Sequence, residues 1–173
     1  LVLRDLDLLK SFPKVTVSWS VNTLDEQFRL DMDRAVSIER RLYAMKQVYD
    51  AGIRTVCFIS PIFPGITDVK AIINQVKDFT DLIWLENLNL RRQFKGDIMN
   101  YIHEKHPELA PLYDEIYNKK RMDYWKTLEQ EISTFAREEG YPYRINDLPY
   151  GRSLHGKPVI VNYFYHEKIR LRK

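Results

Sequence analysis

Residues 54–68, which read RTVCFISPIFPGITD, constrain the fold of this chain more than any other stretch. The first half is a nearly continuous apolar run with β-branched and aromatic residues. Such a run is too short for a helix and is typical of a parallel strand that is covered on both faces. Pro61 and Gly65 then predict a tight loop, and Asp68 predicts the start of a helix. In α/β folds this junction of strand, loop and helix is where ligands bind.

The elements around this segment alternate between helix and strand. Apolar spacing predicts helices over residues 1–12, 37–51 and 67–79, and strands over residues 15–21, 54–60 and 82–88. Further helices are predicted over residues 96–104, 108–117 and 121–139, and a terminal strand over residues 158–165. Because this order implies crossover connections and a parallel sheet, we expect an α/β fold. We expect a partial (β/α) barrel fragment with about three parallel strands (residues 1–91), followed within the same domain by a helical C-terminal region and the terminal strand (residues 92–173).

Residues 15–21 alternate strictly between apolar and small polar side chains. One interpretation is an edge strand with one face in water. The other, which we favour, is that the polar face lines the inside of a sheet that curves around a ligand. The charged stretch that follows, residues 23–36, is predicted to be a long loop, and loops of that length are often functional.

Composition narrows the class of protein. The chain has one cysteine, Cys57, which cannot form an internal disulfide and is predicted to be a core residue. It shows no apolar run of about 18 residues and no signal segment, so we expect no membrane span and a cytoplasmic location.

Residues 141–173 hold seven basic and two acidic side chains, a net charge of +5 against +3 for the whole chain. That end, rich in tyrosine, predicts contact with nucleic acid, although a solvated basic tail is the alternative.

Four short motifs occur in a characteristic order: WSVN at residues 19–22, SIERRL at 37–42, AGI at 51–53 and PIFPGITD at 61–68. In order and spacing they resemble the C-terminal half of radical S-adenosylmethionine enzymes, most closely the spore photoproduct lyase group of DNA-repair proteins. The resemblance covers roughly the first 90 residues. It implies reductive cleavage of S-adenosylmethionine to a 5′-deoxyadenosyl radical, which then abstracts a hydrogen atom from the substrate.

The resemblance also implies where the cofactor binds, although it assigns no catalytic residue. In the segment that cradles adenine in this superfamily, the matching positions are Pro61, Phe63, Gly65 and Asp68. Ser20 matches a residue that hydrogen-bonds the ribose or the methionine part, and Asn22 lies beside it. Arg41 either pairs with the methionine carboxylate or is an ordinary surface arginine. Ser60, Asn87 and Asn89 are added because the carboxyl ends of adjacent parallel strands converge.

One departure from the superfamily is large. Its members hold a 4Fe-4S cluster through three cysteines spaced Cys-x3-Cys-x2-Cys, and this chain has only Cys57. We therefore expect the chain, which begins at Leu1, to be the second half of a longer enzyme and to be inactive alone. The rival hypothesis is a non-enzymatic module that binds nucleic acid through residues 141–173.

Without a preceding strand, the strand at residues 15–21 is predicted to leave an unpaired sheet edge. Either the terminal strand at residues 159–165 folds back onto this edge, or a second copy of the chain pairs there as a homodimer. We favour the homodimer.

Overall fold

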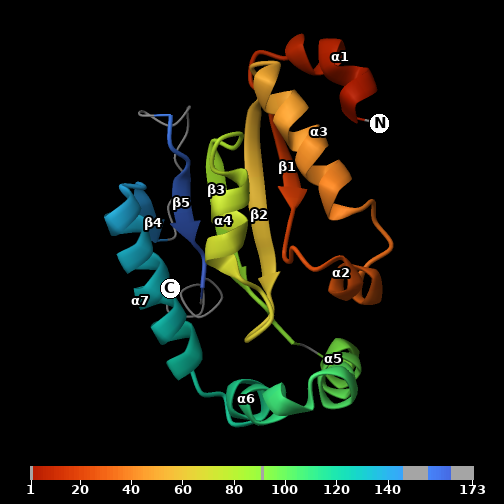
Figure 1. Cartoon of the computed structure of the whole chain (residues 1–173), viewed down its shortest axis with the longest axis vertical. Helices are drawn as coiled ribbons and strands as arrows, with labels where there is room; N and C mark the ends of the chain where they lie inside the picture. The colour runs from red at the N-terminus through yellow and green to blue at the C-terminus, as the bar shows by residue number, and fades with distance from the viewer. Residues whose placement is uncertain (1, 91, 146–155, 165–173) are drawn as a thin grey trace.

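The computed structural model describes residues 2–90, 92–145 and 156–164, and a parallel sheet forms its centre (Figure 1). The strands are β1 (Thr16–Ser20), β2 (Arg54–Ile62), β3 (Leu82–Asn87), β4 (Tyr143–Ile145) and β5 (Val159–Asn162). Their order in the sheet is β1-β2-β3-β5-β4, and every pairing is parallel. The expected α/β class with a parallel sheet is confirmed, and the sheet is open rather than a closed barrel.

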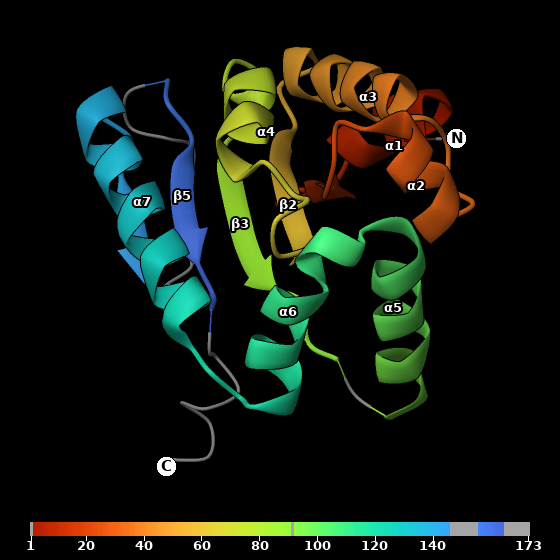
Figure 2. The same cartoon turned by 60° about the horizontal axis from the view of Figure 1, so that its bottom comes forward.

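Helices occupy one face of the sheet and also lie at both of its ends. The helical segments are η1 (Val2–Asp5), α1 (Leu6–Lys10), α2 (Glu26–Met32), α3 (Ile38–Asp50), α4 (Val69–Val76), α5 (Arg92–Lys105), η2 (Pro107–Leu109), α6 (Ala110–Tyr113), η3 (Asp114–Asn118) and α7 (Asp123–Glu139). Helices α3, α4 and α7 lie side by side along one face, whereas α5 and α6 lie at the end toward which the strand arrows point (Figures 1 and 2). In the described chain, no helix is both long and apolar enough to cross a bilayer.

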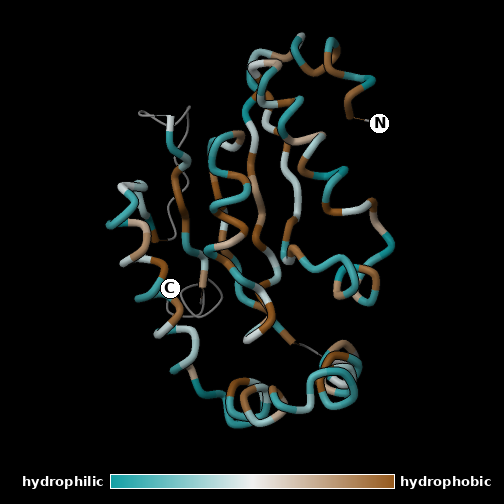
Figure 3. Tube along the Cα trace, viewed as in Figure 1, coloured by the Kyte–Doolittle hydropathy of each residue, from teal (hydrophilic) through white to brown (hydrophobic). Residues whose placement is uncertain are grey.

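The face that carries α3, α4 and α7 holds the main core. Strand residues such as Cys57 and Ile83 pack there against Met45 of α3, Ile72 of α4 and Trp125 of α7, all almost completely buried. In Figure 3 the central strands are strongly hydrophobic, while the edge strand β1 is paler. Burial of this apolar surface is the main term that stabilises the fold.

The second face of the sheet is built differently. Its apolar cluster contains only residues of the strands or directly after them: Val56, Phe58, Leu82, Trp84, Val159, Val161 and Tyr163. No described helix contributes to this cluster. On β1 the same face carries Thr16, Ser18 and Ser20, which are exposed. We call this surface the strand-only face.

Two local predictions are wrong. The stretch of residues 23–36 contains helix α2, because the carboxylate of Asp25 accepts hydrogen bonds from the backbone N–H groups of Gln27 and Phe28 and caps it. Strand β2 does not end before Pro61 but continues to Ile62. The pairing of β2 with β3 shifts register between Ile59 and Ile62, and a proline, which lacks an N–H donor, is accommodated at such an irregularity.

The C-terminal region contributes more to the sheet than expected. The predicted terminal strand is present as β5, but it pairs with β3 and with β4, a strand that the sequence reading missed. Among the described residues the sheet has five strands, against an expectation of about three and a terminal strand, and residues on both sides of position 91 share it. The option that this strand folds back onto β1 is wrong, because β5 lies on the other side of β3.

Candidate functional site

A cavity of about 600 Å³ opens at the carboxyl ends of β1, β2 and β3. That volume is in the range typical of pockets for small molecules and cofactors. The strand ends and the loops after them supply its polar part, and α2 and α5 supply much of its apolar wall. The lining residues are Ser20, Asn22, Met32, Asp33, Arg41, Ser60, Pro61, Phe63, Leu88, Asn89, Leu90, Phe94 and Ile98.

Most of the cofactor-binding residues predicted from the sequence meet in this cavity. The members that line it are Ser20, Asn22, Arg41, Ser60, Pro61, Phe63 and Asn89. Gly65, Asp68 and Asn87 do not line it. On β3, Asn87 follows Ile83 and Leu85 at a spacing of two residues, so its side chain points to the same side of the sheet as theirs. That side faces α3, α4 and α7, away from the strand-only face.

Gly65 and Asp68 have structural partners instead. Gly65 adopts a left-handed φ of 74°, and a Cβ atom there would lie 2.8 Å from Cδ2 of Leu109. Its backbone N–H donates to the hydroxyl of Tyr124 at 3.1 Å. The carboxylate of Asp68 accepts a hydrogen bond from the backbone N–H of Ala71 at 2.9 Å and caps helix α4. Turn geometry and capping therefore account for both residues.

Arg41 is buried, with 7% of its surface exposed, and is not a surface arginine. Its Nη2 donates to both carboxylate oxygens of Asp33, at 2.8 and 2.9 Å. Its Nη1 donates to the backbone oxygen of Ser20 at 3.1 Å, and its Nε donates to that of Val36 at 2.9 Å. The guanidinium thus links the end of β1 to the segment after α2. Its carboxylate partner is Asp33, where the methionine carboxylate of the cofactor was the predicted partner.

The carboxylate of Asp33 is held in its charged form. Burial alone would raise the pKa of Asp33, but hydrogen bonds from Arg41, the backbone N–H of Ala35 and Arg29 together outweigh it, so the pKa lies below its ordinary value. A charged Asp33 keeps Arg41 fixed, and Arg41 keeps the carbonyl of Ser20 fixed.

One hydrogen bond joins the loops that follow β1 and β2, and a second lies within the loop after β2. The hydroxyl of Thr67 donates to the backbone oxygen of Asn22 at 2.8 Å and accepts from the backbone N–H of Phe63 at 2.9 Å. Phe63 then packs edge-to-face on Phe28, with ring centroids 5.0 Å apart. The positions of Asn22 and Phe63 in the cavity are therefore coupled.

Ser60 projects from β2 on the strand-only face, where its hydroxyl donates to Oε2 of Glu86 at 3.0 Å. Because this proton is directed to the carboxylate, the hydroxyl oxygen of Ser60 is available as an acceptor. Glu86 was not among the residues predicted for the site.

The sequence reading also missed part of the wall: Met32, Asp33, Leu88, Leu90, Phe94 and Ile98. Two signals could have found some of them. Met32 and Asp33 fall within the stretch that was predicted to be a functional loop, and Phe94 and Ile98 are four residues apart on one helix, so they share a face.

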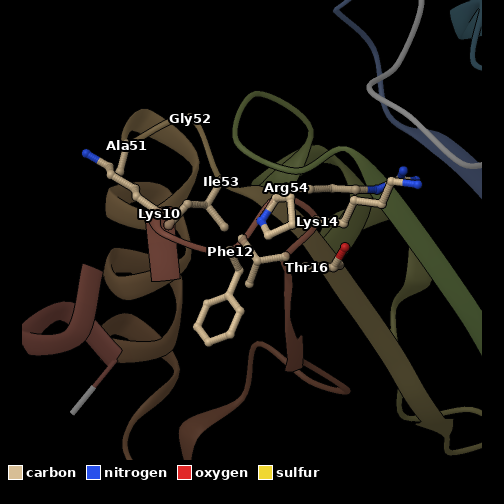
Figure 4. Close-up of a pocket in the computed structure, with 10 residues that line it drawn as sticks. Lys10, Phe12, Lys14, Thr16, Ala51, Gly52, Ile53 and Arg54 are labelled. Carbon is tan, nitrogen blue, oxygen red and sulfur yellow. The ribbon is translucent and has the colours of Figure 1, made fainter. Parts of the chain in front are cut away.

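A second cavity of about 620 Å³ lies at the opposite end of the sheet, near the amino ends of β1 and β2. Figure 4 shows Lys14 and Arg54 extending in the same direction while Lys10 points away from them. No predicted site residue lines this cavity. Ligand sites of parallel α/β proteins are usually at the carboxyl end, which favours the first cavity.

Cys57 lies in the main core and is completely buried. Burial raises the pKa of its thiol to about 12, so it is no source of thiolate. Within residues 2–90, 92–145 and 156–164, no cluster of three or more His, Cys, Asp or Glu side chains is arranged for a metal ion.

The described aromatic residues near the C-terminus already have partners. Tyr141 and Phe164 are buried, Tyr143 accepts a hydrogen bond from Nδ2 of Asn162 at 2.9 Å, and Tyr163 stacks on Trp84. Of the basic residues in this segment, Arg144 and Lys157 are described, and Nζ of Lys157 lies over the ring of Tyr141. Seven other residues predicted to contact nucleic acid lie outside the described residues: Tyr150, Arg152, Tyr165, Lys168, Arg170, Arg172 and Lys173. Contact with nucleic acid through residues 141–173 therefore stays a prediction.

Comparisons with known proteins identify two similar proteins. The chain is 34% identical over 142 residues to uncharacterized protein MJ0683 of Methanocaldococcus jannaschii, which covers 80% of this chain and 51% of that protein. It is 26% identical over 141 residues to uncharacterized protein ORF301 of Acidianus two-tailed virus, which covers 80% of this chain and 44% of that protein. The chain thus spans about half the length of the curated relatives it matches. No protein-family model matches the chain, and no solved structure matches it.

Proposed function

We propose that this chain is the half of a radical S-adenosylmethionine enzyme that holds the adenosyl part of the cofactor in the cavity at the carboxyl end of the sheet. One observation carries the proposal: residues chosen from three separate sequence motifs line a single cavity of suitable volume. Helices on one face and the small polar side chains that β1 presents on the other also suit a half-barrel whose inner surface faces a ligand.

The cavity has the mixed character that an adenosyl group requires. The hydroxyls of Ser20 and Ser60 and the amides of Asn22 and Asn89 are neutral donors and acceptors of the kind that bind ribose hydroxyls. The apolar wall, which includes Phe63, suits a flat base and keeps water away.

Arg41 acts in this proposal as a positioning residue. Since its guanidinium already holds Asp33 and the carbonyl of Ser20, it orients the end of β1 rather than pairing with the ligand. Asp33, held charged, completes this support on the rim of the cavity.

The iron–sulfur cluster does not fit this chain, because a single, completely buried cysteine cannot replace three thiolate ligands. In the proposal the cluster belongs to another part of a longer protein, which is compatible with a match to only about half of each relative. The bound cofactor would supply a carbon radical, and the chain's own residues bind and orient it and exclude water. The proposal includes a cytoplasmic setting, where an unpaired thiol stays reduced.

Calorimetric titration with S-adenosylhomocysteine tests the proposal. We expect weak binding by the 173-residue chain, and we expect Ser20→Ala to weaken it about three- to tenfold because one hydrogen bond is lost. Ser18→Ala is the matched control, since Ser18 shares the strand and the face of Ser20 but does not line the cavity. Equal affinities of the two variants, or no binding by the wild type, would contradict the proposal.

A further inference from the structure

Basic side chains line the cavity of about 620 Å³ at the amino ends of β1 and β2. Lys10, Lys14 and Arg54 are among its lining residues, and none of its lining residues is acidic. A concave surface with cations of one sign attracts anions, and a cavity of this volume can hold a small molecule. The cavity therefore has the charge and the size of a site for a small anionic ligand.

Two of these cations converge. Arg54 of β2 is the register partner of Thr16 of β1, so their side chains point to the same face of the sheet. Figure 4 shows that Lys14 extends in the same direction as Arg54, with Thr16 on the same side, whereas Lys10 points away. A guanidinium can fork onto the oxygens of a phosphate, and an ammonium binds one as a point charge. This end of the cavity thus presents two cations and a hydroxyl together.

The acidic side chains close to this end of the sheet bind elsewhere. Asp81, directly before β3, is buried, and its Oδ2 accepts a hydrogen bond from the backbone N–H of Thr55 at 2.9 Å. Asp50, at the end of α3, pairs with Nζ of Lys46 at 2.8 Å. Neither carboxylate lines the cavity, so its lining residues keep a net positive charge.

The remaining wall of the cavity is largely apolar. Its members include Phe12, Pro13, Val15, Ala51 and Ile53. Phe12 keeps 54% of its surface exposed, so its ring offers a face on which a flat group can stack. A bare phosphate ion would occupy only a small part of the cavity. The cavity therefore suits an anion that also carries an aromatic group.

We propose that this cavity binds an aromatic phosphate monoester, the chemistry of a mononucleotide, with the phosphate between Lys14 and Arg54 and the ring against Phe12. A phosphate monoester carries about two negative charges at neutral pH, which matches two converging cations better than a singly charged diester does. The site lies at the opposite end of the sheet from the cavity that is proposed for the cofactor, so it does not depend on the proposed function.

NMR titration of the ¹⁵N-labelled chain with 1-naphthyl phosphate tests the site. We expect shifts at the amides of Thr16, Gly52 and Arg54, and none at Ser20 or Asn22 of the other cavity. Shifts that are absent, or confined to residues outside this cavity, overturn the proposal.

Two smaller probes separate the contributions of ring and charge. Methyl phosphate keeps the double charge but lacks the ring, and we expect it to bind about tenfold more weakly than 1-naphthyl phosphate. Dimethyl phosphate, which has the single charge of a nucleic-acid backbone phosphate, should bind about fivefold more weakly still. Equal affinities for 1-naphthyl and methyl phosphate overturn the aromatic assignment. Equal affinities for methyl and dimethyl phosphate overturn the monoester and indicate a polynucleotide instead.

Two substitutions test the place of the phosphate. Lys14→Gln should weaken binding of 1-naphthyl phosphate about five- to tenfold, because one of the two converging charges is lost. Lys10→Gln is the matched control, since it removes the same charge from the same cavity but from a side chain that points away, and the loss should be less than about twofold. Both lysines are exposed, so neither change should disturb the fold. Equal losses would show only a general attraction to a basic surface and overturn the site.

Phe12→Ala tests the place of the ring. It should weaken binding of 1-naphthyl phosphate about tenfold and leave that of methyl phosphate unchanged. Leu8→Ala is the control, because Leu8 is a similarly exposed apolar residue of α1 that does not line the cavity. An unchanged affinity in Phe12→Ala, or the same loss in both variants, overturns the stacking contact.

The outcome is separate from that of the proposed function. Lys14 does not line the cavity at the carboxyl end, so affinity for S-adenosylhomocysteine should be the same in Lys14→Gln and wild type. A large loss in that variant would contradict the independence of the two sites. Failure of S-adenosylhomocysteine alone to bind would reject the proposed function and leave the phosphate site in place.

Discussion

The two faces of the sheet are made from the same strands but differ in what covers them. On one face, Cys57, Ile83 and Ile160 are completely buried under α3, α4 and α7. On the strand-only face, β1 shows exposed serines, and the rings of Phe58 and Trp84 are only partly buried. Val56, Leu82 and Val161 are buried on the strand-only face as well, but β1 adds no buried apolar side chain there, so this part of the face can carry ligand-binding groups without a large loss of stability.

This difference has a consequence for mutations. Truncation on the covered face leaves a cavity in a packed interior, whereas truncation of a serine on the strand-only face removes no packed contacts. Stability and binding should therefore respond to different residues.

The largest effect is expected from Ile72→Ala on α4. Ile72 is completely buried in the main core, so the free energy of unfolding should fall by about 3 kcal/mol. Ser18→Ala, on the strand-only face, should change it by less than about 0.5 kcal/mol. Urea denaturation followed by circular dichroism measures both, and equal losses would show that the two faces are packed alike.

An intermediate effect is expected from Asp33→Asn, at the carboxyl end of β1. Arg41 would lose its charged partner but keep the two backbone oxygens of Ser20 and Val36, and Asp33 is partly exposed, so we expect a loss of about 1–2 kcal/mol at neutral pH.

This loss should depend on pH. Because the folded-state pKa of Asp33 lies below its ordinary value of 3.8, its contribution is present above that value and disappears as pH falls through the lowered pKa. The difference in urea midpoint between wild type and Asp33→Asn should therefore shrink as the pH is lowered from neutral to about 2.5. A constant difference across that range would show that the charge of Asp33 is not what stabilises this corner.

The smallest effect on stability, but a change in assembly, is expected from Ser18→Pro. The backbone N–H of Val21 donates to Phe58 of β2, so by alternation the N–H of Trp19 also faces β2 and that of Ser18 faces the open edge. Proline at Ser18 therefore removes only an outward donor. If β1 pairs with a second copy, as we propose, the variant should be monomeric while Ser18→Ala stays dimeric.

Light scattering at high protein concentration makes this measurement. A wild type that is monomeric, or a Ser18→Pro variant that remains dimeric, would refute the dimer through β1.

How far the fold could be predicted depends on the range of the interactions involved. The strand at residues 54–60 and the long helix after residue 121 were predicted because apolar spacing is a local property of the chain. The helix α2 was missed because it is short, and β4 because it has three residues and no periodic pattern. The site was partly predictable, since strand ends such as Ser20 and Ser60 converge in any parallel sheet.

The sequence by itself determined the α/β class, the direction of the strands and the end of the sheet where polar residues gather, because each depends on short windows of alternation, apolar runs and turn residues. Only the tertiary structure decided that Arg41 holds Asp33, that β5 lies between β3 and β4, and that the rings of Phe58, Trp84 and Tyr163 stack on the strand-only face. These contacts join residues far apart in the chain, or depend on which side of a helix or strand a side chain points to. Local propensity carries no information about such pairings, so they are settled when distant surfaces are buried together.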